Sequence, residues 1–515
     1  MRDSNNIASR RREGVRRPSD TGEPGVASTT TMKTKRTTLT AAAALAAMLA
    51  LGGCATRPVN PPIAKVDPAG GYRFETQAAK HEGKPSLVIL AFSGGGTRAA
   101  AFSYGVLEFL RRTEITGADG KTTTRLLDAV DVITGVSGGS FTALAYGLYG
   151  ERLFAEYEQR FLKRNVQGEI VSRVLSPANW GTLGGTATGR SEIAAQLYDE
   201  ILFEGATFGD LRRAKGPFVM ASATDISTGS RFIFTQRLFD ILCSDLDQMR
   251  LSRAAAASSA VPVVLSPITI DNHGGSCDWQ SPAWMKPFLD TENPPRPAAR
   301  AIRSIQAEQA MGDGKRRPFL HLVDGGVSDN VGMRAVLDTL QIVEALHGAG
   351  QPSPLDGKRR IIVFVVNSLS SPPTTWDEAE TPPGTVDILL KASGTPIDAF
   401  SFEAVELLRD TQARWHTLRE VRDSAAMAAN KDPAIAKALR VPDAEIFAID
   451  VSFPALKDKA EFDYLNQQPT SFVLTDEAVD RLRAAAGTII AGSPEFKRLL
   501  VELGARVVPA PAAAK

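Results

Sequence analysis

The segment from residue 130 to residue 149 constrains the fold more than any other part of the chain. It opens with a β-branched run that begins at Val130 and predicts a short buried strand. The spacing Gly135-x-Ser137-x-Gly139 follows, and a helical pattern completes the segment. A serine on a sharp strand-to-helix turn has a strained backbone and a projecting hydroxyl, and the helix N-terminus behind it favours developing negative charge. The pattern predicts a nucleophilic Ser137, and an ordinary Gly/Ser turn is the alternative.

A glycine-rich loop precedes this segment in the chain. Residues 87–92 predict a buried strand, and Gly94, Gly95 and Gly96 follow directly, ahead of a helical run over residues 99–110. Three glycines between a strand and a helix let backbone N–H groups converge on one small space, where they bind a phosphate or an oxyanion.

Nucleotide-binding loops need residues that this loop lacks. A phosphate-binding P-loop has Gly-Lys-Ser/Thr where Thr97 and Arg98 stand, and a dinucleotide-binding loop has glycine where Ala99 stands. Ahead of a serine turn, the loop is better explained as an oxyanion hole, which stabilises charge on a carbonyl oxygen.

A candidate base lies further along the chain. A strand pattern that begins at Phe319 brings Asp324 to the turn Gly325–Gly326. An ordinary Asp-Gly turn is the alternative, because such turns are common. Beside a serine turn and an oxyanion loop, Asp324 is the natural proton acceptor.

Together these segments resemble the patatin-like phospholipase family over residues 86–370. Two further segments in the same order agree with it, Ala223–Thr224–Asp225 with Thr228–Gly229, and residues 257–262. The resemblance implies an α/β fold, a three-layer sandwich whose central, mostly parallel sheet is flanked by helices. It also implies a lipid acyl hydrolase of the phospholipase A type, which releases fatty acids through an acyl-enzyme, without a metal or cofactor.

The resemblance also assigns the site residues. It makes Ser137 the nucleophile and Asp324 the base of a Ser–Asp dyad. The backbone N–H groups of Gly94, Gly95 and Gly96 form the oxyanion hole. The supporting residues are Arg98, Gly135, Gly139, Gly325 and Gly326.

The chain departs from the family pattern in two places. Ala99 stands where the loop often has glycine, and an insertion of residues 271–320 precedes the Asp-Gly-Gly turn. We interpret the insertion as a long loop. Its Trp279, Trp284 and Phe288 suit either a lid that contacts lipid or a packed surface loop.

Two other functions stay open. A Ser–His–Asp triad would place its histidine after the acid, which makes His347 and His416 the candidates. Both lie in helical patterns without a site-like context, which favours the dyad. The other alternative is a catalytically silent, lipid-anchored scaffold of the cell envelope.

The N-terminal region has the pattern of an export signal. A basic cluster over residues 33–36 and an apolar run over residues 39–51 precede Gly52–Gly53–Cys54, which resembles the lipobox of bacterial lipoproteins. We predict that residues 1–53 are a signal segment and that Cys54 carries the lipid. Because no aspartate follows Cys54, an outer-membrane location is expected, and an ordinary secretory peptide is the alternative. Residues 1–31 fit no signal peptide, so Met32 is the expected start.

Charge and cysteine content limit the partners. With 59 Lys and Arg against 58 Asp and Glu, the chain gives no reason to expect nucleic acid. Beyond Cys54, Cys243 and Cys277 either pair in an exported protein or remain buried thiols, and their spacing is not that of a zinc site. The expected partners are a lipid ester substrate and, through Cys54, a membrane.

The expected domain organisation follows. Residues 54–84 predict a Pro-rich flexible tether, and residues 85–370 the catalytic domain. Residues 371–515 predict a mostly helical region, with one strand over residues 444–453, that packs on the catalytic domain. The oligomeric state is not determined by these patterns.

Overall fold

The computed structural model describes residues 57–80, 83–116, 121–179, 189–262, 264–290, 298–353, 355–430 and 432–509. The predicted signal segment and Cys54, the predicted lipidation site, lie outside the described residues. Everything described falls in one compact unit, Ala55–Lys515. None of the helices described here is both long enough and apolar enough to cross a membrane.

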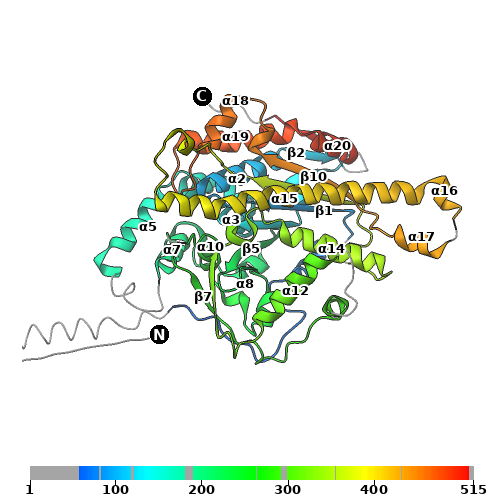
Figure 1. The fold of residues 1–515 in the computed structure, drawn as a ribbon, viewed down its shortest axis with the longest axis horizontal. Coiled ribbons are helices and arrows are strands. Elements are labelled where there is room, and N and C mark those ends of the chain that lie inside the picture. The colour runs from blue at the N-terminus through cyan, green and yellow to red at the C-terminus, as the bar shows by residue number, and fades with distance from the viewer. Residues whose placement is uncertain are drawn as a thin grey trace, which may run out of the picture. The chain divides into compact units, whose positions relative to one another are not determined.

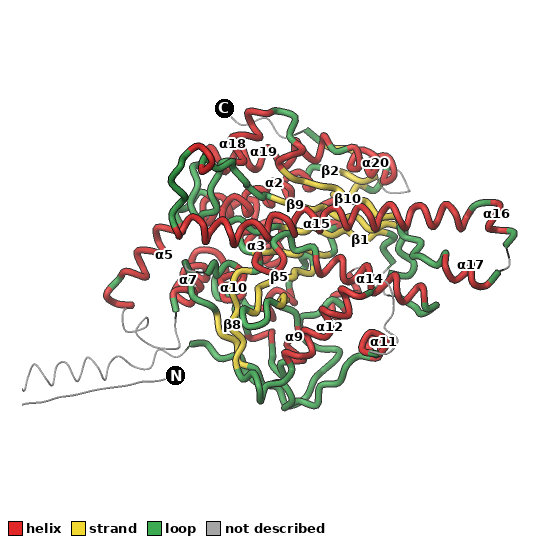
Figure 2. Tube along the Cα trace, in the orientation of Figure 1, coloured by secondary structure: helices red, strands yellow, loops and turns green. Residues whose placement is uncertain are grey.

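An eight-stranded sheet forms the centre of the molecule (Figures 1 and 2). The strand order is β10-β9-β1-β4-β5-β8-β7, and β6 pairs with β5. The first five strands in this order are parallel, whereas β6, β7 and β8 are antiparallel to their neighbours. The bounds are β1 (Ser86–Phe92), β4 (Val132–Val136), β5 (Phe218–Asp225), β6 (Ser230–Ile233), β7 (Ile268–Asp271), β8 (Phe319–Asp324), β9 (Arg360–Asn367) and β10 (Glu445–Ser452).

Helices cover both faces of the sheet, which confirms the predicted three-layer α/β fold. Alternate residues of a strand face opposite sides, so Val88 and Leu90 of β1 pack under α2 (Gly96–Arg111), α3 (Gly138–Tyr149) and α19 (Asp476–Gly492). Leu87 and Ile89 pack under α14 (Arg334–Gly348) and α15 (Thr385–Asp423). The buried, nearly all-apolar strands are typical of a parallel sheet covered on both sides.

The remaining elements are shorter or peripheral. A small antiparallel sheet joins β11 to β2 and β2 to β3. The remaining bounds are β2 (Thr113–Thr116), β3 (Thr123–Arg125), β11 (Ala505–Val507), α4 (Leu153–Tyr157), α5 (Val166–Leu175), α7 (Arg190–Tyr198), α8 (Phe208–Arg213), α9 (Gln236–Ile241), α10 (Leu251–Ser258), α11 (Lys286–Leu289), α12 (Ala299–Met311), α13 (Gly326–Asp329), α16 (Ala425–Ala428), α17 (Pro433–Ala438), α18 (Lys459–Asn466) and α20 (Pro494–Leu503).

The C-terminal region shares its core with the catalytic sheet. Strand β10 extends the sheet by pairing in parallel with β9 along its whole length. Helix α19, capped by the Thr475 side chain, packs on α2. The last strand, β11, pairs with β2 of the N-terminal half.

The expected flexible tether is wrong for its described residues, 57–80 and 83–84. Arg57 pairs with Asp271, and the buried Asn60 side chain donates to the carbonyl oxygen of Asp271 at 2.9 Å. Tyr72 is fully buried, with its ring stacked on Phe218. The proline content predicts an extended chain. It does not predict that apolar and charged side chains of this segment pack against the rest of the protein.

The insertion of residues 271–320 is not a plain loop. It contains α11 and the thirteen-residue helix α12. Phe288 is buried, Trp279 packs against the main core, and Trp284 remains 38% exposed. Two of the three aromatic residues are therefore core residues, and a lipid-contacting role for the set loses its basis.

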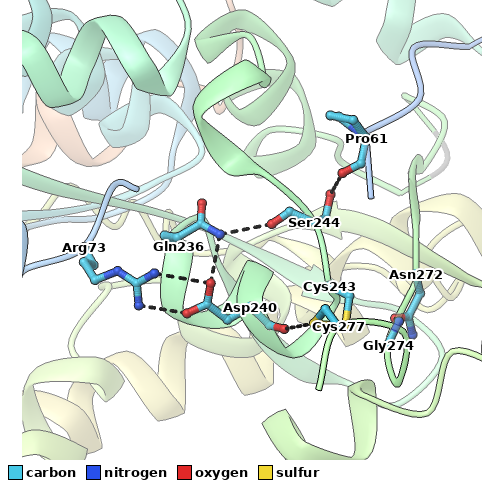
Figure 3. Close-up of a disulfide and its surroundings, with 9 residues drawn as sticks. All are labelled: Pro61, Arg73, Gln236, Asp240, Cys243, Ser244, Asn272, Gly274 and Cys277. Carbon is cyan, nitrogen blue, oxygen red and sulfur yellow. Dashed lines mark hydrogen bonds and ion pairs between the residues drawn. A yellow bond between two sulfur atoms is a disulfide. The ribbon is translucent and has the colours of Figure 1, made fainter. Parts of the chain in front are cut away.

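A disulfide joins Cys243, after α9, to Cys277 in the insertion (Figure 3). Nearby, Arg73 forms an ion pair with Asp240 at 2.8 Å. Of the two alternatives for these cysteines, the structure therefore has the paired form, which attaches the start of the insertion to the body.

Candidate active site

Ser137 occupies the strained turn that its sequence context predicted. It follows β4 with φ 47° and ψ −121°, directly before the first residue of α3, and is only 4% exposed. A side chain at Gly135 would come within 2.8 Å of the Ser140 Cα, and one at Gly139 within 2.6 Å of the Ser93 carbonyl oxygen. The flanking glycines are needed because the turn lies between packed backbones.

Asp324 ends β8, and its carboxylate accepts the N–H of Gly326 at 2.7 Å. The Ser137 side chain lies close enough to the same carboxylate to stabilise its charge. Burial raises the pKa of Asp324 to about 6, although the Gly326 N–H and the Ser137 side chain act against the rise. The structure thus brings the two residues together and gives the carboxylate the basicity that a proton acceptor needs near neutral pH.

The three loop glycines differ in their hydrogen bonding. The Gly94 N–H donates to the Asn330 carbonyl oxygen at 2.9 Å, so this group is already occupied. Gly95 and Gly96 have φ of 137° and 60°, values that strongly favour glycine. The prediction is therefore corrected for Gly94, whose N–H attaches the loop to the segment after Asp324. Gly95 and Gly96 remain the candidate donors of an oxyanion hole.

Gly138 was not among the predicted site residues. It begins α3, and a side chain there would lie 1.9 Å from the carbonyl oxygen of Gly96, the first residue of α2. The N-termini of two helices therefore meet beside Ser137, and their free N–H groups and dipoles favour an anion at this point. Its position directly after Ser137 is the sequence signal that could have identified Gly138, because the residue after such a serine contributes a backbone N–H to an oxyanion hole.

Arg98 supports the loop from behind. Its buried guanidinium donates to the carbonyl oxygens of Ser368 at 2.7 Å and Gln468 at 2.6 Å, and to the Thr470 hydroxyl at 3.1 Å. Burial lowers the pKa of Arg98 to about 10, although the charge of Asp398 acts against the shift. Through these contacts Arg98 joins the glycine loop to Ser368 and to residues 468–470, which is a structural role.

Residues 466–474, here named the C-terminal strap, pack against the glycine loop and α3. The Thr97 N–H donates to the Ser471 carbonyl oxygen at 2.8 Å, and a side chain at Gly96 would come within 2.3 Å of that oxygen. The Phe472 ring packs on Phe141 at 5.6 Å between centroids. Sequence patterns gave no signal for this role, because the strap lies some 370 residues from the loop that it contacts.

The short segment from Ser258 to Ala260 joins the nucleophile to the base. The Ser137 N–H donates to the Ser258 hydroxyl at 2.8 Å. The Gly325 N–H donates to the Ser258 carbonyl oxygen, and the Asp324 N–H to that of Ala260, both at 3.0 Å. In the sequence, this segment contributes to the family resemblance and carries no local signal of this role.

Gly325 and Gly326, after Asp324, must be glycines for the same steric reason as those around Ser137. A side chain at Gly325 would come within 2.4 Å of the Ser222 carbonyl oxygen. One at Gly326 would lie 3.1 Å from the Asp324 carboxylate and 3.0 Å from the Asn330 side-chain oxygen. All the predicted site residues other than Cys54 therefore lie around one point.

The candidate triad histidines lie elsewhere. His347 contacts Asp356 at 3.0 Å, and the exposed His416 contacts Glu420 at 3.3 Å. Two further described histidines bond to other groups, His273 to the Asn60 carbonyl oxygen and His321 to Thr269. Among the described residues, no cluster has the composition of a metal site.

A family model described as patatin-like phospholipase matches residues 90–337. A search of curated proteins finds no match. The similar solved structures include human GIVD cytosolic phospholipase A2 and its complex with methyl gamma-linolenyl fluorophosphonate, at 15% and 13% identity and a TM-score of 0.37. The alignments cover 83% and 84% of this chain, which spans 62% of the length of those chains. Residues 90–337 therefore form a patatin-like phospholipase domain.

Proposed function

We propose that this protein is a serine-dependent lipid acyl hydrolase of the phospholipase A type, with Ser137 as nucleophile and Asp324 as base. The observation that carries the proposal is the pairing of a strained serine with a buried carboxylate whose pKa is raised to about 6. The family match makes a lipid ester the expected substrate.

The reaction follows from this arrangement. Ser137 Oγ attacks the ester carbonyl carbon, and its proton passes to the Asp324 carboxylate. The Gly95 and Gly96 N–H groups, with the N-terminus of α3, stabilise the oxyanion. When the C–O bond breaks, the alcohol leaves with the proton from Asp324, and an acyl-enzyme remains on Ser137.

The second half returns the enzyme to its starting state. Water attacks the acyl carbon and gives its proton to Asp324. The bond to Ser137 Oγ breaks, the serine recovers its proton, and a fatty acid is released. Asp324 thus serves as base and then as acid in each half, which a group with a pKa near the working pH does well.

Fatty acid release from mixed phospholipid vesicles tests the proposal. We expect release by the wild-type protein, none by Ser137→Ala or Asp324→Asn, and full release by His416→Ala and His347→Ala. Loss of activity in a histidine variant would support the triad instead. Equal inactivity of wild type and Ser137→Ala, with no fluorophosphonate labelling of Ser137, would favour the silent scaffold.

We also propose that the protein is a lipoprotein of the bacterial cell envelope, anchored through Cys54. The lipobox-like sequence motivates this, and the Cys243–Cys277 disulfide supports it, because such bonds persist in oxidising compartments. Bacterial cells fed an alkyne-tagged fatty acid should label the wild-type protein and not Cys54→Ser. Equal labelling of both would contradict the anchor, and membrane fractionation would test the outer-membrane location.

A further inference from the structure

A cavity away from the candidate active site lies on the side of the sheet that α12 and α14 cover. Its volume is about 570 Å³, within the range of ligand-binding pockets. Neither Ser137 nor Asp324 is among its described lining residues. It is lined by the opposite ends of the parallel strands: Val132 of β4, five residues before Ser137, stands about 16 Å from it along the strand.

Most of the wall is apolar. Leu87 and Ile89 of β1 line the sheet side, and Val336 and Leu340 of α14 lie opposite. Met220 is only half-buried although it belongs to β5, a central strand of the sheet. A central-strand side chain that remains accessible shows that the helices do not close over the sheet here, so the space suits an alkyl chain.

One end of the cavity carries two arginines. Arg231 pairs with Asp338 at 3.1 Å and contacts the Ser304 hydroxyl at 3.3 Å, while Arg237 pairs with Glu308 at 2.9 Å. Ser304 and Glu308 are four residues apart on α12, so the two guanidinium groups approach it about one turn, or ~5.4 Å, apart.

Each arginine keeps an unused donor. The Nε of Arg231 and one terminal nitrogen of Arg237 are buried and have no hydrogen-bond partner among the described residues. Buried N–H groups without a partner are costly, and Arg231 also lies 3.9 Å from the Asp329 carboxylate, its second acidic neighbour. One oxygen of Glu308 and one of Asp338 also have no hydrogen-bond partner among the described residues, but each lies within ion-pair distance of an arginine, Arg237 and Arg300 respectively. The unused donors are thus left for an added acceptor, and a carboxylate accepts a hydrogen bond on each oxygen.

We propose that this cavity binds a long-chain fatty acid, the product class of the proposed hydrolase, with its carboxylate on Arg231 and Arg237 and its chain along the apolar wall. The choice of this ligand rests on the proposed function. The cavity itself depends on α12 of the insertion, so the insertion would give this chain a product-binding site separate from the catalytic one.

Binding of cis-parinaric acid to the full chain carrying Ser137→Ala tests the proposal. Trp284 lines the cavity, so excitation energy should pass from it to the bound probe. We expect Trp284→Phe to reduce this transfer without changing affinity. Thr339→Trp, at an exposed lining position of α14, should fill the cavity and weaken binding at least about tenfold.

The head group is tested by removing both partners of one ion pair, because a lone Glu308 would itself be destabilising. The double variant Arg237→Gln, Glu308→Gln should weaken binding of the acid about tenfold and that of its methyl ester much less. Equal losses for acid and ester would overturn the assignment of the carboxylate to this end.

Thr488→Trp is the matched control, since Thr488 is an exposed threonine of another surface groove, between α19 and β10. It should leave binding unchanged. Equal binding by Thr339→Trp, Thr488→Trp and the parent protein would overturn the cavity site. Hydrolysis by the protein with an intact Ser137 is measured separately, so a failed cavity and a failed hydrolase are distinguished.

Discussion

The backbone N–H of Ser137 donates a 2.8 Å hydrogen bond to the side-chain hydroxyl of Ser258. Because the Ser258 carbonyl oxygen accepts the Gly325 N–H, one residue holds the nucleophile turn and the turn after Asp324 in register. Strained backbone persists only where surrounding contacts over-determine it, and Ser258 is one of those contacts.

Ser258→Ala should therefore lower kcat/KM on the order of tenfold, because the Ser137 N–H loses its acceptor and the turn relaxes. The loss should appear in kcat and in the rate of fluorophosphonate labelling, with KM little changed. Ser259→Ala is the control, since that hydroxyl donates to the Ala255 carbonyl oxygen at the end of α10 and also interacts with Tyr198. Equal losses in both variants would point to a general packing effect.

Activity should fall as the pH drops through about 6, because Asp324 must be ionised to accept the Ser137 proton. A pH profile of kcat/KM on a soluble ester measures this limb. A midpoint near the ordinary aspartate pKa of about 4 would contradict the role of burial.

The same pKa has a consequence for stability. Asp324 is protonated more readily in the folded than in the unfolded state, so folding stability falls as the pH rises from about 4 to about 6 and is then constant. Asp324→Asn removes this loss and should be relatively more stable above pH 6, by up to about 3 kcal/mol. Urea unfolding of both proteins at low and neutral pH checks the sign.

Gly138→Ala should abolish activity, by at least on the order of a hundredfold, because its methyl group would collide with the Gly96 carbonyl oxygen and distort the oxyanion hole. Gly348→Ala is the control, at a helical position with open space around the added carbon. Steady-state kinetics on both variants, with circular dichroism to verify folding, makes the comparison. Full activity in Gly138→Ala would exclude the close approach of α2 and α3.

Arg98→Met should release the C-terminal strap, because the carbonyl oxygens of Ser368 and Gln468 lose their charged donor. We expect a loss of about 2 kcal/mol in unfolding free energy and faster proteolysis within residues 466–474. Limited proteolysis with mass spectrometry measures the second effect. Arg213→Met, at an exposed pair with Asp210, should change neither.

Replacing both Cys243 and Cys277 by serine should cost about 4 kcal/mol, because the bond closes a loop with a sequence separation of 34. Activity at low temperature should be retained, since neither cysteine contacts the site residues. Thermal unfolding of the wild type with and without reductant provides an independent measurement. No shift in either comparison would mean that the cysteines are not paired in the protein.

Local patterns were sufficient for the strands and turns that carry Gly94–Gly96, Ser137 and Asp324, and the family resemblance was sufficient for the fold class. The turn around Ser137, the glycine loop and the turn after Asp324 are each specified within a dozen residues, by strand periodicity and by glycines that permit close backbone contact. Parallel pairing of β1 with β4 brings the glycine loop beside Ser137, because the carboxyl ends of adjacent parallel strands lie at one edge. Strand β8 is antiparallel to β5, and Asp324 reaches the same place because β8 ends opposite Ala223.

Only the tertiary structure decided the finer organisation. The Gly94 N–H donates to Asn330, Ser471 packs on the glycine loop, and Phe472 packs on Phe141. These are contacts between residues hundreds of positions apart. The same holds for the packed N-terminal segment after Arg57 and for the cavity under α12. Such contacts form only when folding brings distant side chains and carbonyl groups together. They therefore produce no periodic pattern in the sequence around either partner.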